Sequence, residues 1–403
     1  MSIDNFKPQF DNAYEEVFQK ALVAKNIMNT RFEPVLKYGA SVERVLFDIS
    51  GVRVRTVVRG AASTIDSVTD SNELLTINIE KEAVFYISDG EVTQAGPLNP
   101  GEEFGKQIGK KVAIDLDARC FAEVLNALYS FDNGDLTTMS STGTPITLSS
   151  TTVPQMVTKM PAKLRYRNQQ DIDSDMVFVI DSYAAADVNQ FLLGKNIDLA
   201  GYVFKNGYTG DISNAQLYIS ENLTGSAELY IPQTPSDGDT VVIGGVIFTF
   251  NTTLSTLAGS VLISGSADAA RANLVALINT PETTTTFGTA LSAADQLLIA
   301  DAMKLVATNN NTTDVAALTG TGSGRLIVAG TLTNTNNTWT KNYINAYFGK
   351  FGAIDLVIQD IKPVDMRPTS DRRGTNVFSS YLAGLKTFAD GAKKFLRVKI
   401  AVA

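Results

Sequence analysis

The sequence predicts an α+β fold in which one larger domain is interrupted by a smaller inserted one. Apolar residues recur at three- and four-residue spacing in residues 10–28 and 101–129, which is the pattern of amphipathic helices. Apolar and polar residues alternate in residues 74–87, as in a strand. Between Ile231 and Trp339 the composition changes to one rich in Thr, Asn, Gly, Ala and Ser. A chain that leaves a core and later returns to it carries an inserted domain.

Length and composition limit the kinds of chemistry that we expect. The chain has 403 residues, enough for more than one core. It contains no histidine, which excludes Ser-His-Asp and Cys-His triads and zinc sites with imidazole ligands. Its single cysteine, Cys120, excludes an intrachain disulfide. We therefore expect no catalytic residue, no cofactor and no metal site.

The charge of the chain argues against wrapping of nucleic acid by bulk electrostatics. The net charge is −8. Residues 231–338 hold seven acids and only three bases, which are Arg271, Lys304 and Arg325. The inserted segment is thus distinctly acidic, whereas the rest is close to balanced. Local cationic patches remain in the rest, such as the one formed by Arg53, Arg55 and Arg59.

The sequence gives no sign of membrane insertion or secretion. No apolar run approaches the ~20 residues of a membrane span. Residues 1–10 carry neither a basic region nor an apolar stretch typical of a signal peptide. We therefore expect the protein to mature in the cytoplasm and to have no membrane partner.

Cap and breaker residues set the expected limits of the helices. The first helix begins near Asp11 and stops before Pro34. Another starts at Val153, and Pro161 should kink or end it. A buried strand over residues 176–180 leads to a helix over 183–193, with Asp181 and Ser182 as its cap.

Residues 42–87 predict a long two-stranded arm. Strand patterns cover 42–58 and 74–87, and the linking residues 59–72 are small and polar. In the first strand the apolar residues Val52 and Val54 alternate with cations. An isolated hairpin is marginal in water, so this arm should need a neighbour on which to lie.

The inserted segment has its own strand and helix signals. Residues 240–243 and 246–250 flank Gly244-Gly245, which favours a tight hairpin turn. Residues 266–279 and 292–307 predict two helices, each with a Ser N-cap, and residues 325–330 predict a further strand. These elements predict a compact α+β unit that folds by itself.

Three short motifs have a functional and a structural interpretation, and the structural one is favoured in each case. Alternating Asp171, Asp173 and Asp175 could bind a metal, but a solvated loop is favoured because no further ligands are visible. The glycines at 320, 322 and 324 lack the spacing of a phosphate loop and favour a hairpin loop. Cys120 lies on an apolar helix stripe and favours a buried core thiol over a nucleophile.

Several segments, taken in order, resemble the major capsid proteins of tailed phages. The stretch Asn206-Gly207-Tyr208-Thr209-Gly210-Asp211-Ile212, followed by residues 216–223 (QLYISENL), is similar to that family's "NGxxGxI…xVYxSNNL" pattern. Residues 381–388 (YLAGLKTF) resemble its "LYGxKVF" close, and residues 76–89 (TINIEKEAVFYISD) resemble the run ahead of its long helix. The order of the segments carries the resemblance, which covers most of the chain outside the insert.

The resemblance implies the Hong-Kong-97-type phage capsid fold with an inserted small α+β domain. It makes residues 1–41 an N-terminal arm, 42–100 an extended loop lying on a neighbouring subunit, and 101–175 a peripheral domain with a spine helix. The remaining assignments are residues 176–230 with 340–403 as the axial and peripheral core, and residues 231–339 as the insertion domain.

The function that the resemblance implies is that of a major capsid protein. Such a protein assembles into the icosahedral shell around the double-stranded DNA of a tailed phage, within the host cytoplasm. The implied partners are copies of itself in pentamers and hexamers, portal, scaffolding and decoration proteins, and packaged DNA through non-specific contact. The residues expected to contact another subunit are all in the arm: Arg53, Arg55, Arg59, Asp66 and Asp70.

Other classes of protein remain open at this point. A phage tail or adhesin-like structural protein would fit the Thr- and Asn-rich insert, although a fibre would show repeats and none is found. An encapsulin-type compartment shell would share the capsid fold. A carboxylate-dependent enzyme would need several acids to converge in a pocket.

Overall fold

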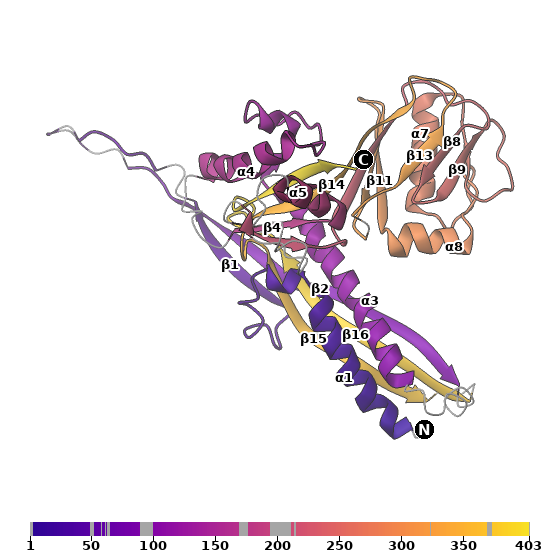
Figure 1. Cartoon of the computed structure of the whole chain (residues 1–403), viewed down its shortest axis with the longest axis horizontal. Coiled ribbons are helices and arrows are strands. Elements are labelled where there is room, and N and C mark those ends of the chain that lie inside the picture. Colours follow the sequence, from indigo (N-terminus) through magenta and orange to yellow (C-terminus); the bar gives the residue numbers. More distant parts are fainter. Residues whose placement is uncertain are drawn as a thin grey trace. The chain divides into compact units, whose positions relative to one another are not determined.

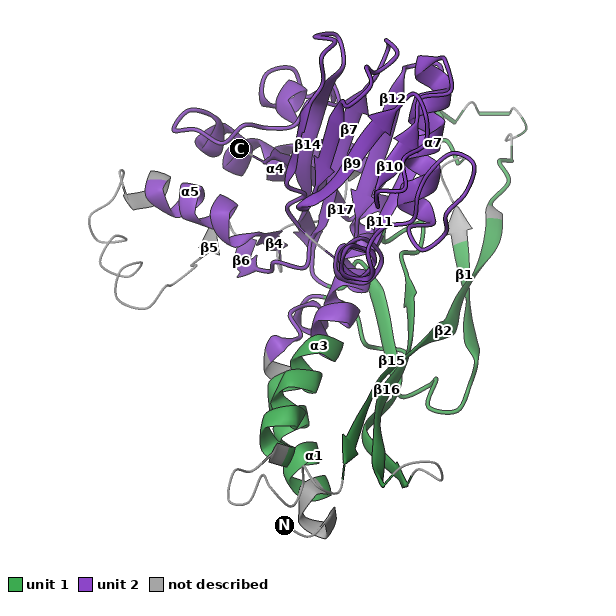
Figure 2. Ribbon diagram, turned by 90° about the vertical axis from the view of Figure 1, so that its right-hand side faces the viewer, with its two compact units in different colours: residues 1–20, 28–112, 352–392 green, residues 21–27, 113–351, 393–403 purple. Residues whose placement is uncertain are grey.

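The structure is a computed structural model that describes residues 3–48, 52–57, 59–60, 62, 65–88, 100–168, 176–193, 211–212, 215–322, 324–368 and 373–402. It confirms the α+β class (Figure 1). The chain separates into two compact units, coloured in Figure 2. Unit 1 comprises residues 1–20, 28–112 and 352–392, and unit 2 comprises residues 21–27, 113–351 and 393–403.

Unit 1 is built on an antiparallel four-stranded sheet in the order β1-β2-β16-β15. Its strands are β1 (Ser41–Asp48), β2 (Thr69–Ser88), β15 (Asp355–Pro368) and β16 (Gly374–Lys386). The predicted pairing of two strands in the arm is confirmed, since Ser41 to Asp48 pair in register with Thr76 back to Thr69. The first strand is shorter than predicted. Residues 52–57 are not in a strand, and there the backbone N–H of Arg53 bonds to the Asp66 carboxylate instead of to a ladder partner.

Two helices of unit 1 pack with their backbones in close contact. α1 (Ile3–Ala21) lies against the first turns of α3 (Pro100–Ala122). A Cβ placed on Gly105 would stand 2.5 Å from the carbonyl oxygen of Phe10, and one on Gly109 would stand 2.8 Å from that of Tyr14. The two glycines weaken the helix by about 1 kcal/mol each, and the close approach explains why they stand there.

Unit 2 is built on a nine-stranded sheet whose path runs β11-β12-β7-β14-β4-β6-β5, with β17 paired to β14 and to β3. Its central strand is β14 (Thr338–Lys350), whose residues 343–349 are all buried. The strands beside it are β4 (Met176–Ile180), β7 (Thr224–Tyr230) and β17 (Phe395–Ala401). The shorter ones are β3 (Tyr129–Phe131), β5 (Asp211–Ile212) and β6 (Ala215–Ile219).

Helix α5 matches its predicted range, whereas α4 and α3 depart from their predicted ranges beyond their first turns. α5 (Ser182–Leu193) follows β4, and Asp181 caps it by accepting the backbone N–H of Ala184 at 3.1 Å. α4 (Thr152–Asn168) continues through Pro161 instead of ending there. The long helix α3 ends at Ala122 and passes into a 3-10 turn over Glu123–Asn126, short of the predicted residue 129.

Residues 231–338, predicted from the sequence to be an insert and called the inserted segment below, contain a second sheet, in the order β10-β9-β8-β13. The predicted hairpin is confirmed: β8 (Thr240–Ile243) and β9 (Val246–Asn251) flank two glycines with φ values of 60° and 90°. The other two strands are β10 (Ser260–Leu262) and β13 (Val328–Thr331). The helix α7 (Ala267–Asn279) has the predicted Ser266 cap.

The second predicted helix of the segment is wrong beyond residue 302. α8 (Ala293–Gln296) continues as a π-helical stretch over Leu297–Ala302, and β11 (Leu305–Asn310) and β12 (Val315–Gly320) follow. In β11 the buried Leu305 and Ala307 alternate with the exposed Val306 and Thr308. This alternation has the period of two that is typical of a strand, and β12 supplies the hydrogen-bonding partner.

The segment shares a sheet and a core with the strands around it. β12 pairs with β7 along the full length of β12, from Val315–Tyr230 to Gly320–Gly225. Ala227 and Leu229 of β7 belong to the same buried cluster as Val241, Phe248 and Leu274 of the segment. The boundary at residues 231 and 339 and independent folding stay predictions.

We predict that Gly105→Ala and Gly109→Ala each lower the thermal stability of the protein. Alanine gains about 1 kcal/mol of helix propensity, but its Cβ meets backbone of α1 that cannot rotate away, and overpacking of this kind costs about 1–3 kcal/mol. Lys110→Ala is the matched control, since Lys110 is exposed on the same helix. Melting curves test this, and a Gly105→Ala protein as stable as the Lys110→Ala protein would contradict it.

Candidate interaction surface

The structure brings three of the five arm residues singled out in the sequence together within one chain. The Asp66 carboxylate accepts the backbone N–H of Arg53 at 2.9 Å and pairs with the Arg55 guanidinium at 2.6 Å. The Arg55 hydrogen bond, followed by that from Arg53, lowers the pKa of Asp66. Arg59 is exposed in a turn, and Asp70 is exposed on β2. Asp66 thus fixes the local shape of the arm.

The same part of the arm exposes apolar side chains. Val54 is 105% exposed, Ile65 93% and Val57 83%. Single exposed apolar residues are normal on a protein surface, but several on one extended segment indicate a surface that another molecule covers. The arm therefore combines apolar contact area with cations, which suits a protein–protein interface.

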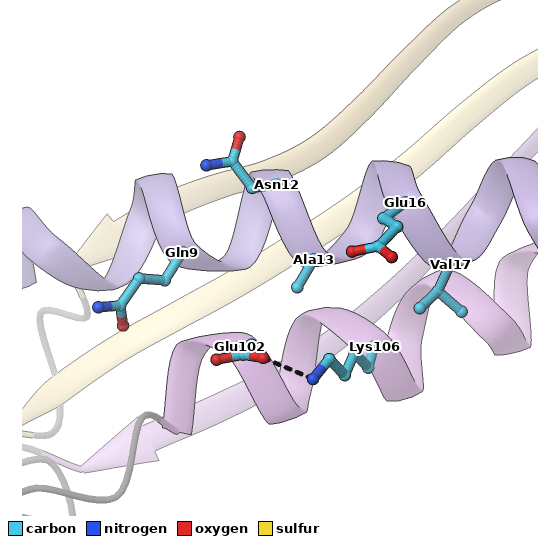
Figure 3. Close-up of a pocket in the computed structure, with 7 residues that line it drawn as sticks. All are labelled: Gln9, Asn12, Ala13, Glu16, Val17, Glu102 and Lys106. Carbon is cyan, nitrogen blue, oxygen red and sulfur yellow. Dashed lines mark hydrogen bonds and ion pairs between the residues drawn. The ribbon is translucent and has the colours of Figure 1, made fainter.

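The described grooves of unit 1 lack the features of an active site. One, of about 380 Å³, lies between α1 and α3 (Figure 3) and is lined by Gln9, Asn12, Ala13, Glu16, Val17, Glu102 and Lys106. Its one drawn ion pair, between Glu102 and Lys106, runs along α3. A second groove, of about 470 Å³, lies over β2, β15 and β16 and mixes acids such as Glu80 with bases such as Lys362.

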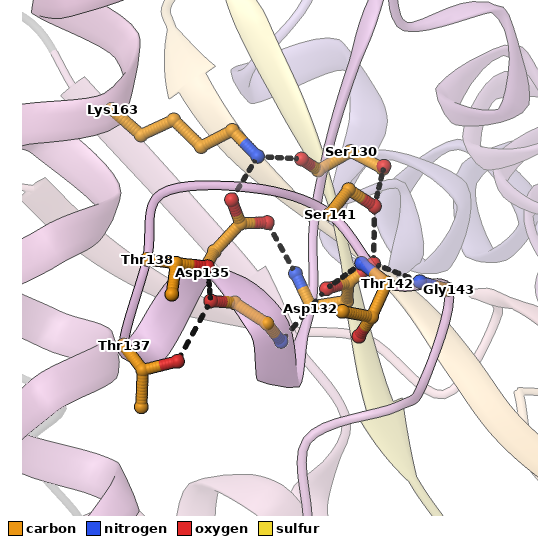
Figure 4. Close-up of polar contacts among 10 residues, drawn as sticks. Ser130, Asp132, Asp135, Thr137, Thr138, Ser141, Thr142, Gly143 and Lys163 are labelled. Atoms are coloured by element: carbon orange, nitrogen blue, oxygen red, sulfur yellow. Dashed lines mark hydrogen bonds and ion pairs between the residues drawn. The ribbon is translucent and has the colours of Figure 1, made fainter.

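A buried polar network in unit 2 holds the loop that follows β3 (Figure 4). Asp132 accepts the backbone N–H groups of Gly134, Thr142 and Gly143 and the Ser141 hydroxyl. Burial alone would raise the pKa of Asp132, but these hydrogen bonds outweigh it and lower the pKa.

The same network ties α4 to the loop. Lys163 Nζ pairs with the buried Asp135 carboxylate and donates to the Ser130 carbonyl at 2.6 Å. Because the buried Lys163 ammonium has both a carboxylate and a carbonyl as partners, it has a structural role and holds α4 to the loop.

Asp117 of α3 is another buried acid in unit 2. Its side chain is 0% exposed and accepts the backbone N–H groups of Val23 and Ala24 at 3.0 and 2.9 Å. Burial raises its pKa to about 6, although these hydrogen bonds and that from Asn222 act to lower it. The Asp117 carboxylate thus connects α3 with Val23 and Ala24, which follow α1, within unit 2.

All three cations of the inserted segment have acidic partners within unit 2. Arg271 is fully buried and bonds to Asp268 and to the Ile231 carbonyl. Lys304 pairs with Asp115 of α3 at 2.8 Å. Arg325 pairs with Asp181, the cap of α5. The latter two ion pairs tie the segment to the rest of the unit.

The remaining motifs show no chemistry in the part of the chain that the structure describes. Gly322 lies where a Cβ would meet the Ala302 carbonyl oxygen at 2.1 Å, so this glycine serves close packing. Cys120 is buried, and burial raises the pKa of its thiol well above the ordinary value. The described residues contain no group of three or more His, Cys, Asp or Glu that could hold a metal. Asp171, Asp173 and Asp175, like residues 206–210, lie outside the described residues.

Among the described residues, no helix is both long enough and apolar enough to cross a membrane.

Comparison with solved structures identifies the fold. The chain is similar to a structure from Mycobacterium phage Che8, with a TM-score of 0.51 and 13% identity over 93% of this chain and 90% of that one. It also matches a capsid structure of Cyanophage P-SCSP1u, with a TM-score of 0.44 and 11% identity over 91% and 84% of the two chains. The mature capsid of bacteriophage PhiM1 matches with a TM-score of 0.45 and 10% identity over 90% and 82%. No protein-family model and no curated protein sequence matches the chain. The first likeness shows that this chain has the fold of the Che8 structure.

We predict that Asp117 makes the protein less stable as the pH rises from 4 to 7. Its folded pKa of about 6 lies above the ordinary 3.8, so the folded chain binds this proton more tightly than the unfolded chain. The stabilisation is complete at low pH and is lost as the pH rises through about 6. At ~1.4 kcal/mol per pKa unit, it amounts to at most about 3 kcal/mol.

The measurement is the pH dependence of the free energy of unfolding, in the wild type and in Asp117→Asn. The variant should lose less stability between pH 4 and pH 7. Asp187→Asn, an exposed acid on α5, is the control and should follow the wild type. Parallel curves for the wild type and Asp117→Asn would contradict the prediction.

Proposed function

We propose that this chain is a major capsid protein that assembles into the closed icosahedral shell of a tailed phage. The observation that carries the proposal is the fold, shared with a phage structure over at least nine-tenths of both chains. The ordered capsid-like segments of the sequence agree with it. The arm agrees as well, because it exposes apolar and cationic residues that a neighbouring copy would cover.

In this proposal the protein acts by binding copies of itself in pentamers and hexamers. Portal, scaffolding and decoration proteins and packaged DNA would be its other partners, and assembly would occur in the host cytoplasm. The protein itself would be structural, with no catalytic step. A compartment shell of the encapsulin type is the alternative that shares the fold, and the enclosed cargo separates the two.

The inserted segment would face the exterior of the shell. Its three cations are engaged by acids of the same unit, while Asp237, Glu282 and Asp301 are exposed. A surface of this sign is repelled by phosphate, which disfavours the DNA side.

Assembly is the direct test of the proposed function. The purified chain, or the chain co-expressed with phage assembly proteins, should form closed shells of uniform size in electron micrographs. Rods would indicate a tail or fibre protein. A chain that stays monomeric under every assembly condition would overturn the proposal.

We predict that arm cations contact carboxylates of a neighbouring subunit, so Arg55→Glu should reduce the particle yield and leave the subunit soluble. Asp66 already pairs with Arg55 in the same chain, and loss of that pair alone could act on the arm. The charge swap Arg55→Glu with Asp66→Arg restores an intrachain pair of reversed sign. It should still assemble poorly, because the neighbour's carboxylate then faces a glutamate.

A second variant separates the two causes further. Arg59→Glu changes a cation at the tip of the arm that lies apart from the Asp66 pair, and it should also lower the yield. Normal yield from both the swapped protein and Arg59→Glu would show that these cations contact no neighbour.

We predict that the inserted segment, as an isolated fragment, is more stable with its flanking strands than without them. Residues 224–345 include β7, whose Ala227 and Leu229 belong to the segment's core. This fragment should melt cooperatively and at a higher temperature than residues 231–337, which lack that strand. Calorimetry of the two fragments tests this, and equal melting temperatures would contradict it.

A further inference from the structure

We propose that Gln359, Arg44 and Glu73 form a clamp that sets the direction in which the arm leaves its own subunit. The inference rests on the proposed function for its consequence in a shell, although the clamp itself is a property of the single chain. The clamp residues act on the arm through the segments that they hold, so they are positioning residues.

The root of the arm has a small core of its own. Leu36, Leu75, Val357 and Phe388 form a buried cluster, separate from the core of the inserted segment. Leu36 precedes β1, Leu75 lies in β2, and the other two come from the far end of the sequence. This cluster joins both strands of the arm to β15 and to the residues after β16.

Gln359 holds the chain just before β1 begins. Its side-chain amide donates to the Leu36 carbonyl at 2.6 Å and to the Gly39 carbonyl at 2.8 Å. The register of β15 with β16 shifts between Ile358 and Asp360, which leaves Gln359 as the extra residue of a β-bulge. A bulge re-aims a side chain, and here it directs the amide to the loop that leads into the arm.

Arg44 and Glu73 hold the arm to the residues that follow β16. They lie directly opposite each other in the β1–β2 ladder. The Arg44 guanidinium pairs with Asp390 at 2.7 Å and stands 5.1 Å from the ring centroid of Phe388. The Glu73 carboxylate accepts the backbone N–H of Ala389 at 3.0 Å. Together, Arg44 and Glu73 thus contact three consecutive residues, 388–390.

Beyond the root, the polar contacts of Asp66 with Arg53 and Arg55 lie within the arm itself. β1 ends at Asp48, and residues 52–57 are exposed throughout. The direction of the arm is therefore decided at its root. In a closed shell of identical copies, the angle between neighbours fixes whether and at what size the shell closes. The clamp would thus set the curvature of the particle.

The arm direction can be measured on the unassembled subunit. Spin labels are attached at Ser67→Cys on the arm and at Lys110→Cys on α3. Double electron–electron resonance then measures the distance between the two labelled positions. Both positions are exposed, and the buried Cys120 should not take the label. The wild-type clamp should give a single narrow distance distribution.

Gln359→Leu removes both amide donors and keeps a similar side-chain volume. It should raise the population of a released arm roughly thirtyfold, the factor that two net hydrogen bonds of ordinary strength are worth. The distance distribution should broaden accordingly. Gln155→Leu, an exposed glutamine on α4, is the matched control and should leave it narrow. Arg44→Ala should broaden it as well, and Arg44→Lys, which keeps the cation, should broaden it less.

Assembly of the same variants tests the consequence. Gln359→Leu particles should vary more in diameter than wild-type particles in electron micrographs. Unchanged distance distributions in both Gln359→Leu and Arg44→Ala would overturn the clamp. Broadened distances with uniform particles would overturn its role in curvature. Wild-type subunits that form no particles would instead count against the proposed function, with the distance measurement still valid.

Discussion

The arm of this chain carries apolar surface that its own fold leaves exposed, and this constraint shapes the rest of unit 1. Val54, Val57 and Ile65 would lose solvent contact only against another molecule. A segment that must meet a partner has to be presented in a defined direction. The bulge at Gln359 and the cross-strand pair of Arg44 and Glu73 provide that direction in the free subunit, before any partner binds. Ordering the root in advance lowers the entropy that association must overcome.

Unit 2 satisfies a different requirement, that of holding an acidic segment firmly. The segment has only three cations, and its ion pairs with Asp115 and Asp181 place two of them at the boundary with the surrounding elements. Pairing of β12 with β7 adds backbone hydrogen bonds, and the shared core adds apolar burial. The sheet that holds the segment continues from β12 through β7 to the central strand β14. This suits a shell that must withstand pressure, as the proposed function requires.

The sequence was most informative where one local signal acted alone. The Gly244-Gly245 turn, the Ser266 cap and the Asp181 cap each depend on a few neighbouring residues, and each is confirmed. Prediction failed where long-range pairing decided the outcome. Residues 305–307 continued a helical pattern and became a strand because β12 offered a partner. Gly105 and Gly109 are weak helix formers by local propensity, and their role depends on the close approach of the distant backbone of α1.

The arm shows the same division between local and distant information. The sequence predicted two paired strands, but residues 52–57, where apolar residues alternate with cations, are not in a strand, and Asp66 as the partner of Arg55 within the chain was not predicted. Gln359 carried no recognisable signal, because a bulge appears in a sequence only as one residue too many between paired strands. Residues that contact a partner can thus be suggested by exposure and charge. The residues that set the direction of the arm can be recognised only when the register of β15 with β16 is known. These residues connect the fold of one subunit to the geometry of a whole assembly.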